Sequence, residues 1–335
     1  MKTAIVILNW NGKTLLERFL PSVLANSKGQ ADVYLADNAS TDDSVSYCKE
    51  LFPELTIIEN TVNGGYAKGY NDALQHIEAD LYVLLNSDVE TPEGWLDPMI
   101  ALFKSDSTIG AAQPKILDLN KKTHFEYAGA AGGFLDSLGY PYCRGRIFEH
   151  CEEDLGQYNN TLEVQWASGA CLCVRADVFK KVSGLDEDYF AHQEEIDLCR
   201  RISNAGYKIV ANGESAVFHL GGGTLATSNP KKTFYNFRNS LFTIVKNEKR
   251  GVALRIFARL ILDGIAGVRF VFLGKFNHLW AIIKAHFSFY YFLPKIMGKR
   301  KVQENKTSSS RPKAIVYSYY IKGITRYSQM RIKKG

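Results

Sequence analysis

The sequence predicts an α/β protein in which a mostly parallel sheet is flanked by helices and followed by a basic, amphipathic helical tail. Strand and helix signals alternate over the first 115 residues, as in the units that build parallel sheets. The strand segments are continuous apolar runs, which is typical of strands covered on both faces. The composition changes at Arg250, beyond which basic and aromatic residues accumulate.

Apolar runs predict the strands of the first half at residues 4–8, 33–36, 56–58 and 81–85. Apolar residues spaced by three and four positions predict helices between them, over residues 15–24 and 67–77. Asp42 and Asp43 after Ser40 suit the start of another helix. A further helix is expected to begin at Pro92 and to end near Phe103. This alternation predicts the parallel part of the sheet.

The second half begins with a segment, residues 118–165, that is expected to be rich in loops. Strands are then predicted over residues 170–174, 207–211 and 216–220. A short helix is expected from Asp177 and a longer one from about Gln193.

Charge is distributed unevenly along the 335 residues. The net charge is +6, but residues 250–335 contain 18 Lys and Arg against two acids, and the remainder contains 23 Lys and Arg against 33 acids. An acidic body argues against a nucleic-acid-binding protein, and a basic tail predicts an anionic partner, with a membrane surface as the leading candidate.

The tail is expected to lie on a membrane and not to cross it. Residues 252–273 are apolar but interrupted by four charges, each of which is costly at the centre of a bilayer. Residues 282–293 fall short of the roughly 20 needed to span one. Interfacial helices fit this composition, and the alternative is that the helices pack on the body or on a second subunit.

The location expected from the sequence is the cytoplasm, on the inner face of the cell membrane. The apolar run at residues 4–8 is too short for a signal peptide and reads as a strand. The six cysteines form no C-x-x-C pair and no metal-ligand spacing, which predicts buried, reduced thiols.

Four polar loops follow the strands of the first half, at the edge where open parallel sheets bind ligands. They are residues 9–12 (Asn-Trp-Asn-Gly), 37–42 (Asp-Asn-Ala-Ser-Thr-Asp), 63–71 (Asn-Gly-Gly-Tyr-Ala-Lys-Gly-Tyr-Asn) and 86–88 (Asn-Ser-Asp). Gly64 and Gly65 precede a helix and would let its amino end approach a phosphate closely. Their spacing matches neither the dinucleotide-binding motif nor the P-loop. The loops predict a nucleotide-sized polar ligand.

Several side chains are candidates for chemistry. Asp37 could accept hydrogen bonds from a base or ribose, or only form a turn. Asp88 follows a buried strand directly and could bind a hard cation such as Mg²⁺ or Mn²⁺, or only cap a helix. His219 ends a strand and is a second candidate metal ligand, although a lone histidine there is as often structural.

A candidate general base lies at the start of the helix from Gln193. Glu195 shares a stripe with Leu198, Cys199 and Ile202, so its carboxylate is expected to face inward. Glu194, Asp197 and Arg201 share another face and are expected to form an ion-pair cluster. The alternative is that Glu194 and Glu195 only stabilise the helix start.

These motifs resemble those of family 2 glycosyltransferases of the GT-A fold over residues 3–245. The resemblance lies in the four loops and, in the same order, in Ser168-Gly169-Ala170, Gly184-Leu185-Asp186-Glu187 and residues 194–201 (Glu-Glu-Ile-Asp-Leu-Cys-Arg-Arg), with His219 after them. Within the family, the Asn-Gly-Gly and Leu-Asn-Ser-Asp sequences of these loops look most like those of rhamnosyltransferase-type members that use dTDP-rhamnose.

The resemblance implies a role for each matched position. Glu195 is implied to be the catalytic base. Asp88, the last residue of the family's D-x-D motif, and His219 are implied to bind a divalent cation, Mg²⁺ or Mn²⁺. The positions implied to hold the nucleotide sugar are Asn9, Asn11, Asp37, Asn38, Gly65, Asn71, Asn86, Gly169 and Glu194. Two positions depart from the pattern, since Asn86 replaces the first Asp of D-x-D and Glu195 replaces a base that is commonly Asp.

The expected protein is therefore an inverting, metal-dependent glycosyltransferase of cell-surface polysaccharide synthesis. Its catalytic domain would span residues 1–248, with a nucleotide-binding half (1–115) and an acceptor-binding half (116–248). Amphipathic helices would follow at 249–300 and a basic tail at 301–335. The expected partners are a nucleotide-sugar donor, a saccharide or lipid-linked acceptor and an anionic membrane surface, with oligomers possible and no nucleic acid. The alternatives are a non-catalytic nucleotide-sugar-binding subunit and a sugar-nucleotide pyrophosphorylase, whose sheet usually opens with a Gly-rich loop that is absent here.

Overall fold

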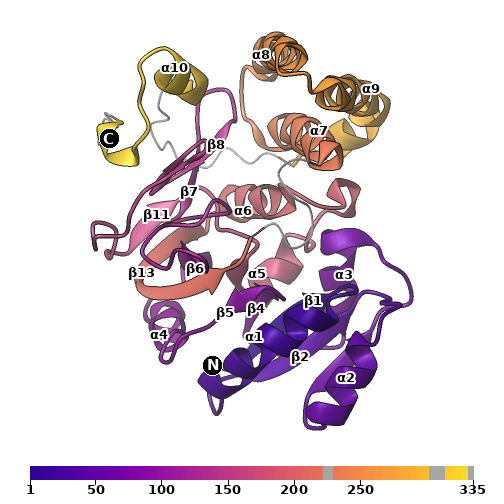
Figure 1. Ribbon diagram of the computed structural model, residues 1–335, viewed down its shortest axis with the longest axis vertical. Helices are drawn as coiled ribbons and strands as arrows, with labels where there is room; N and C mark the ends of the chain where they lie inside the picture. Colours follow the sequence, from indigo (N-terminus) through magenta and orange to yellow (C-terminus); the bar gives the residue numbers. More distant parts are fainter. Residues whose placement is uncertain (222–228, 302–313, 331–335) are drawn as a thin grey trace.

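The computed structural model describes residues 1–221, 229–301 and 314–330, and within them the main sheet has nine strands (Figure 1). Its parallel part contains, in spatial order, β3 (Thr56–Glu59), β2 (Asp32–Asp37), β1 (Thr3–Asn9) and β4 (Leu81–Asn86). The sheet continues from β4 through β12 (Cys171–Arg175), β6 (Ile109–Asp118), β13 (Lys208–His219) and β11 (Leu162–Val164), and the short β5 (Val89–Glu90) also pairs with β13. The predicted α/β class is confirmed, and antiparallel pairing by β12 joins its two halves.

Two apolar cores cover the two faces of this sheet, as the uninterrupted apolar strands predict. Along β1, Ile5 and Ile7 belong to one core and Ala4 and Val6 to the other, because successive side chains point to opposite faces. The first core packs under α1 (Lys13–Asn26) and α4 (Asp97–Ser105). The second packs under α3 (Gly65–Leu74), α5 (Ala176–Lys181) and α6 (Glu194–Asn204). Helix α2 (Ser44–Leu51) adds Cys48 to the first core.

Two sequence-based boundaries are wrong. The two strands expected over residues 207–220 form one strand, β13, whose register against β6 shifts between Asn212 and Ala216. The helix expected from Pro92 begins only at Asp97. Val89 and Glu90 pair with β13, and Gly94 adopts a left-handed conformation (φ 70°), so the chain cannot be helical before Trp95. The pairing of β13 with β6 and that of β5 with β13 are both long-range, and a local sequence pattern does not indicate them.

The loop-rich segment contains a second, smaller sheet of antiparallel strands. In order, these are β10 (His150–Cys151), β9 (Arg146–Ile147), β8 (Pro141–Cys143) and β7 (Gly133–Leu135). The C-terminal segment at 314–330, with α10 (Ile315–Tyr320), packs on this sheet, and the ring of Tyr327 stacks on Phe134. Residues 302–313 and 331–335 of the predicted basic tail lie outside the described residues.

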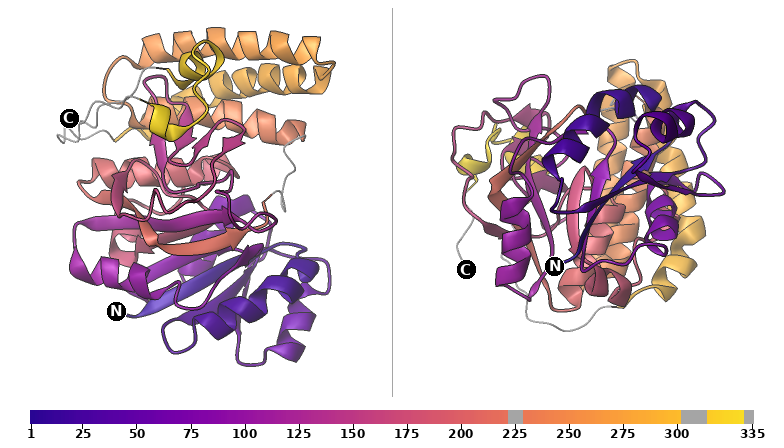
Figure 2. Two further views of the ribbon diagram at one scale, coloured as in Figure 1. Left: turned by 60° about the vertical axis from the view of Figure 1, so that its left-hand side comes forward. Right: turned by 90° about the horizontal axis from the view of Figure 1, so that it is seen from below.

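Three long helices form the layer farthest from the parallel strands (Figure 2). They are α7 (Pro230–Asn247), α8 (Val252–Phe272) and α9 (Phe276–Gly298), and α9 packs on both α7 and α8. The sequence left open whether the tail helices lie on a membrane or pack on the body or on a second subunit. Helix α9 packs on the body. Within the described parts of the chain, every helix is either too short or too polar to cross a bilayer.

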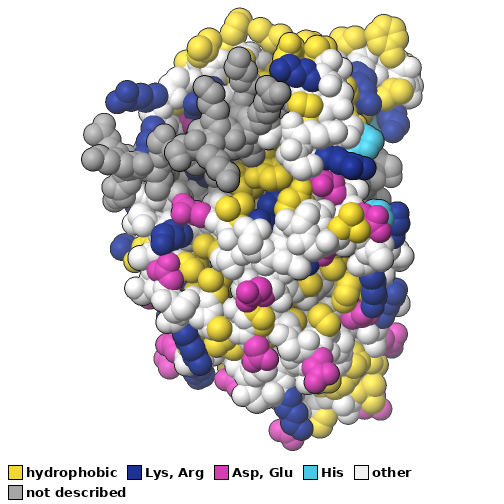
Figure 3. All heavy atoms as spheres, turned by 90° about the vertical axis from the view of Figure 1, so that its left-hand side faces the viewer, with side chains coloured by type: hydrophobic (Ala, Val, Ile, Leu, Met, Phe, Trp, Pro, Cys, Tyr) yellow, Lys and Arg dark blue, Asp and Glu magenta, His cyan; other side chains and the backbone are white. Residues whose placement is uncertain are grey.

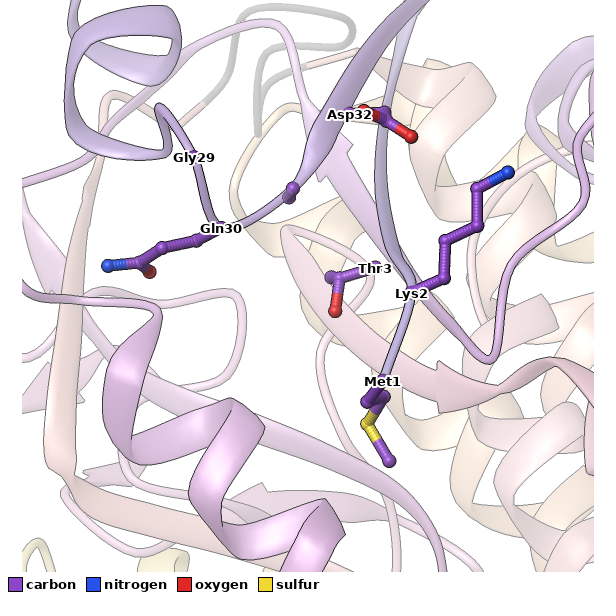
Figure 4. Close-up of a pocket in the computed structure, with 7 residues that line it drawn as sticks. Met1, Lys2, Thr3, Gly29, Gln30 and Asp32 are labelled. Carbon is purple, nitrogen blue, oxygen red and sulfur yellow. The ribbon is translucent and has the colours of Figure 1, made fainter.

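The described cysteines are all unpaired thiols, and all except the half-buried Cys151 are buried, which agrees with the sequence-based expectation. A shallow hollow lies at the amino ends of β1 and β2, between Lys2, Gly29, Gln30 and Asp32 (Figure 4). It is at the opposite end of the strands from the polar loops.

The helical layer depends on one buried carboxylate, Asp263 of α8. It accepts a hydrogen bond from Tyr140 (3.3 Å), pairs with Arg259 (3.6 Å) and contacts His286 of α9 (3.2 Å). We expect Asp263→Ala to lower the free energy of unfolding by about 3–5 kcal/mol, because it leaves the buried Arg259 cation uncompensated. Urea denaturation measures this change. The control Glu59→Ala, which removes the exposed pair with Lys49, should cost less than about 1 kcal/mol, and an equal loss in both variants would contradict the assignment.

Candidate active site

The polar loops of the first half converge because their strands are in register. Asn9 and Asp37 are paired neighbours at the carboxyl ends of β1 and β2. Both are buried, and the amide Nδ2 of Asn9 donates to Oδ1 of Asp37 (2.9 Å) and to the hydroxyl of Ser44 (2.9 Å). The second oxygen of Asp37 accepts from the backbone N–H of Ser40 (2.9 Å). Asn9 therefore fixes the orientation of the Asp37 carboxylate.

The neighbouring asparagines organise the loops themselves. Oδ1 of Asn11 accepts from the backbone N–H of Thr41 (2.7 Å), across the gap between the first two loops. The amide of Asn38 donates to Oδ1 of Asn63 (3.0 Å) and to the carbonyl of Gly65 (3.1 Å), which ties the second loop to the third. Of the residues predicted to bind the nucleotide, Asn9, Asn11, Asp37 and Asn38 thus lie together at one sheet edge.

Gly65 and Asn71 make contacts within the protein. At Gly65 the backbone is left-handed (φ 78°), and a Cβ atom there would lie 2.4 Å from the carbonyl oxygen of Phe190. The N–H of Tyr66 donates to the same oxygen (2.8 Å). The Asn71 amide both donates to and accepts from the backbone of Leu185. Helix α3 is therefore joined at both positions to the segment that precedes α6.

Asp88 and His219, 131 positions apart in the sequence, meet because β5 pairs with β13. Val89 lies opposite His219 in this ladder, and the carbonyl of Asp88 accepts from the N–H of Leu220 (3.0 Å). The side chains contact one another through Asp88 Oδ1 and His219 Nε2 (3.1 Å), and Asn86 Nδ2 is 3.4 Å from the same nitrogen. On its other side, His219 Nδ1 contacts Glu126 (3.1 Å).

Two carboxylates flank the imidazole of His219. Burial lowers the pKa of His219, but hydrogen bonds to Asp88 and Glu126 raise it to about 10 in the metal-free cluster. A cation that binds Nε2 would have to displace the proton shared with Asp88. Among the described residues no group of three or more His, Cys, Asp and Glu side chains forms a metal site by itself. A Mg²⁺ or Mn²⁺ ion that takes its remaining ligands from a diphosphate needs only one or two side chains. Asp88 and His219 fit that requirement, with Glu126 orienting the imidazole.

Glu194 and Glu195 begin α6 side by side. Glu194 is buried, Glu195 is half-buried, and within the described structure Oε2 of Glu194 has no hydrogen-bond partner. Burial, and then the adjacent Glu195, raise the pKa of Glu194 well above its usual range. Burial also raises the pKa of Glu195 to about 7, although the N–H groups at the helix start oppose the shift. Glu195 thus has a pKa suited to a general base near neutral pH.

The segment at residues 168–170 connects this carboxylate with the end of β4. A Cβ atom at Gly169 would lie 3.8 Å from Cβ of Glu195 and 3.0 Å from the hydroxyl of Tyr66. That hydroxyl donates to the Gly169 carbonyl (2.8 Å), and the next carbonyl, of Ala170, accepts from the N–H of Asn86 (3.1 Å). Gly169 therefore lets the Tyr66 hydroxyl approach closely, and residues 168–170 lie against both Glu195 and the end of β4, two residues before Asp88.

The ion-pair cluster predicted on α6 is wrong in one member. Asp197 pairs with Arg201 (2.8 Å), as expected, but its other partner is Lys246 of α7 (2.8 Å) and not a residue of α6. Lys246 also pairs with Asp186 (2.5 Å). Glu194 lies outside this network. The helical wheel placed Glu194 and Asp197 on one face but could not show that α7 covers it.

Sequence reasoning missed Glu126, Tyr66 and Lys246. Glu126 lies in a Gly- and Ala-rich stretch without periodicity, and Lys246 lies in α7, a helix that the sequence analysis did not predict. The one available signal was for Tyr66, which stands in the predicted third loop beside Gly65.

Comparison with known proteins agrees with this geometry. The model of glycosyl transferase family 2 matches residues 4–182. The chain is 28% identical, over 64% of its length and 75% of the relative, to the N-acetylglucosaminyl-diphospho-decaprenol L-rhamnosyltransferase of Mycobacterium tuberculosis. A shorter match, 42% identical over 52 residues, links 16% of the chain to 19% of the rhamnosyltransferase WbbL of Escherichia coli K12.

Solved structures of low sequence identity share the fold. The mannosyltransferase PcManGT of Pyrobaculum calidifontis, in complex with GDP-Man and Mn²⁺, aligns over 87% of both chains with a TM-score of 0.54 and 14% identity. GalNAc-T7 with UDP, GalNAc and Mn²⁺ aligns over 65% of this chain and 43% of its own, with a TM-score of 0.54 and 17% identity. The GT-A fold expected from the motifs is confirmed.

The pKa of Glu195 predicts a pH dependence. A base acts only when ionised, so with a pKa near 7 the value of kcat/KM should rise with pH through about 7 and fall about tenfold per unit below it. Initial rates between pH 5 and 9, with a donor whose own ionisation is constant over that range, measure this. A flat profile across neutral pH would contradict the assigned role of Glu195.

Proposed function

The chain belongs to glycosyl transferase family 2, and we propose that it transfers a sugar from a nucleoside-diphosphate donor to a saccharide acceptor with inversion at the anomeric carbon. One observation carries the proposal. Residues 168–170 lie against Glu195, a half-buried carboxylate of raised pKa, and against the end of β4, two residues before Asp88, which contacts His219. A general base and a candidate cation site are the two groups that such a displacement needs.

In the proposed reaction Glu195 accepts the proton of an acceptor hydroxyl as that oxygen attacks the anomeric carbon. The new C–O bond forms on the face opposite the departing diphosphate, and the old bond breaks with its electron pair on the nucleoside diphosphate. A single in-line displacement therefore inverts the anomeric configuration. A divalent cation held by Asp88 and His219 would offset the charge that develops on the diphosphate.

The loops of the first half would hold the nucleotide. Asn9 holds the Asp37 carboxylate in one orientation, which suits it to accept hydrogen bonds from a ribose or base. Asn11 and Asn38 fix the loops around it, whereas the amide of Asn71 is bound to Leu185 and would act on the nucleotide site only by holding α3 in place. Asn86, Gly169 and Glu194 complete the proposed substrate site.

The names of the related proteins suggest which donor and which acceptor this chain uses. The Mycobacterium tuberculosis protein is named as a rhamnosyltransferase acting on a diphospho-decaprenol-linked sugar, and the matched segment of the Escherichia coli protein also belongs to a rhamnosyltransferase. We therefore propose dTDP-rhamnose as donor and a lipid-linked saccharide of cell-surface polysaccharide synthesis as acceptor.

A lipid-linked acceptor requires a position at a membrane, and the outer helices have a surface that fits one. Along α8, six apolar side chains more than half exposed are spaced by three or four positions and so lie on one helix face: Leu254, Phe257, Ile261, Ile265, Val268 and Phe272. Helix α9 adds exposed aromatic residues, among them Phe276, Trp280 and Phe287. We call these nine residues the α8–α9 face. Figure 3 shows hydrophobic side chains along the upper rim, the end at which Figure 1 places α8.

The charges around the α8–α9 face favour an anionic bilayer over a second copy of the chain. Arg269, Lys275 and Lys284 are exposed, and the single acid of residues 249–300, Asp263, is buried. A symmetric dimer through this face would set like charges against each other, whereas anionic lipid headgroups would neutralise them. We propose that the protein binds the inner face of the cell membrane through this surface.

The role of Glu195 is tested with Glu195→Gln, which keeps the shape of the side chain but cannot accept a proton. We expect kcat to fall by about 10²- to 10⁴-fold, while calorimetry shows donor affinity unchanged. Release of nucleoside diphosphate measures turnover, and NMR of the product measures the anomeric configuration. Glu78→Gln, at an exposed carboxylate outside the motifs and the proposed site, is the control and should retain wild-type turnover.

Two results would overturn this assignment. Turnover of Glu195→Gln near the wild-type rate would exclude Glu195 as the base. A product with retained anomeric configuration would exclude a single displacement.

The membrane surface is tested by replacing Phe257, Ile261 and Ile265 together with Ser. Flotation with vesicles containing anionic phospholipid should recover the wild-type protein and lose most of the triple variant, since both apolar area and an anionic surface contribute to binding. Ser at three exposed apolar positions elsewhere, Leu51, Val62 and Leu155, is the control and should leave flotation unchanged.

Equal flotation of the wild type and the Phe257, Ile261, Ile265 variant would contradict the lipid surface. So would a wild-type dimer in solution that this variant, but not its control, converts to a monomer.

A further inference from the structure

The backbone immediately before α6 is held in an uncommon conformation. Phe190, His192 and Gln193 all have positive φ angles, of 63°, 68° and 68°. Side chains other than glycine rarely adopt this region, so such residues persist only where surrounding contacts fix them. Gln193 is the N-cap of α6 and directly precedes Glu194 and Glu195. The direction in which α6 begins therefore depends on what holds residues 189–193.

One side chain of α7, Asn239, donates to three of the backbone carbonyls in this turn. Its amide nitrogen Nδ2 lies within hydrogen-bond distance of three backbone carbonyls, those of Tyr189 (3.1 Å), Ala191 (2.9 Å) and His192 (2.7 Å). An amide has two N–H groups, so one of them is shared. Asn239 is fully buried.

The orientation of the amide is itself fixed. Oδ1 of Asn239 accepts from Nε of the preceding Arg238 (2.9 Å), which leaves Nδ2 facing the turn. The guanidinium of Arg238 also donates to the carbonyls of Asp188 (2.9 Å) and Tyr189 (3.1 Å). In the opposite direction, the side chain of Gln193 in the turn donates to the carbonyl of Asn236 on α7 (3.2 Å). Each successive carbonyl from 188 to 192, except that of Phe190, is thus bound by α7.

The carbonyl of Phe190 has its own partner in the other half of the molecule. It accepts a hydrogen bond from the N–H of Tyr66 at the start of α3. The same oxygen lies so close to Gly65 that a Cβ atom there would be 2.4 Å from it. The turn is therefore held between α7 and the nucleotide-binding half. Three carbonyl dipoles that converge on one point repel one another unless a donor lies between them, and Asn239 supplies that donor.

We propose that Asn239 is a positioning residue for Glu195, which fixes the left-handed turn and thereby the direction in which α6 presents the carboxylate. The proposal rests on the function proposed for Glu195. Asn239 touches no reacting atom; it acts through the backbone of residues 189–193. Misplacing a catalytic group by about 1 Å costs about 100-fold in rate, so loss of this contact should impair turnover far more than donor binding.

The test is Asn239→Asp, which preserves the shape but replaces the donor nitrogen by an oxygen. We expect kcat to fall by about 100-fold, with the donor dissociation constant unchanged in calorimetry. Hydrogen exchange of the amides at 189–195 should accelerate in the variant, whether or not transfer is assayed. The matched control is Asn212→Asp, at another buried asparagine whose amide donates to a single carbonyl, that of Pro98 (3.1 Å), far from the turn in sequence. It should lose thermal stability but keep its kcat at a temperature at which both variants are folded.

The outcomes separate this proposal from the proposed function. Wild-type kcat in Asn239→Asp, or equal losses of kcat in the two variants at equal loss of Tm, would overturn the positioning role. Loss of donor binding in Asn239→Asp would also overturn it, because the turn would then support the nucleotide site. If the wild-type protein transfers no sugar while exchange at 189–195 still accelerates in Asn239→Asp alone, the structural part holds and the proposed function fails.

Discussion

Burial of carboxylates at the centre of the molecule is the constraint on which the rest of the structure depends. A buried charge is stable only with compensating partners. Asp88, Asp197 and Asp263 contact His219, Lys246 and His286, and the uncharged amide of Asn9 donates to Asp37. These partners come from distant segments, so satisfying each carboxylate joins two parts of the chain. Glu194 and Glu195 have no salt-bridge partner among the described residues, and burial raises their pKa. The exception is the site where a proton acceptor is useful.

The sheet explains how the site draws on both halves of the chain. The parallel strands present the loops that organise around Asn9 and Asp37, and antiparallel β12 then connects them to β6 and β13. Because β12 follows residues 168–170 directly, the segment beside Glu195 is anchored to the strand that ends at Asn86. The elements proposed for catalysis and for nucleotide binding are thereby held on one scaffold, as transfer between two bound substrates would require.

The helical layer has two faces with different tasks. Its inner side, α7, binds the carbonyls before α6 and supplies Lys246 to Asp197 and Asp186. Helix α9 adds Lys295 and Lys299, which pair with Asp188 and Asp186. Its outer side exposes the apolar α8–α9 face. Of the helices that by composition belong to the tail, α9 therefore also holds the segment that precedes the proposed base.

The sequence by itself determined the α/β class, most elements of the first half, the polar sheet edge and the family, because apolar periodicity and the order of short motifs are local properties. It also singled out Asp88, His219 and Glu195, and the family resemblance implied that Asp88 and His219 bind one cation. Only the tertiary structure decided that β5 pairs with β13 to bring Asp88 against His219, that Glu126 lies behind the imidazole and that Asn239 holds the turn before α6. These contacts join residues 47 to 131 positions apart, and no local pattern encodes them. They form because buried carbonyls and carboxylates must find partners wherever the folded chain brings them.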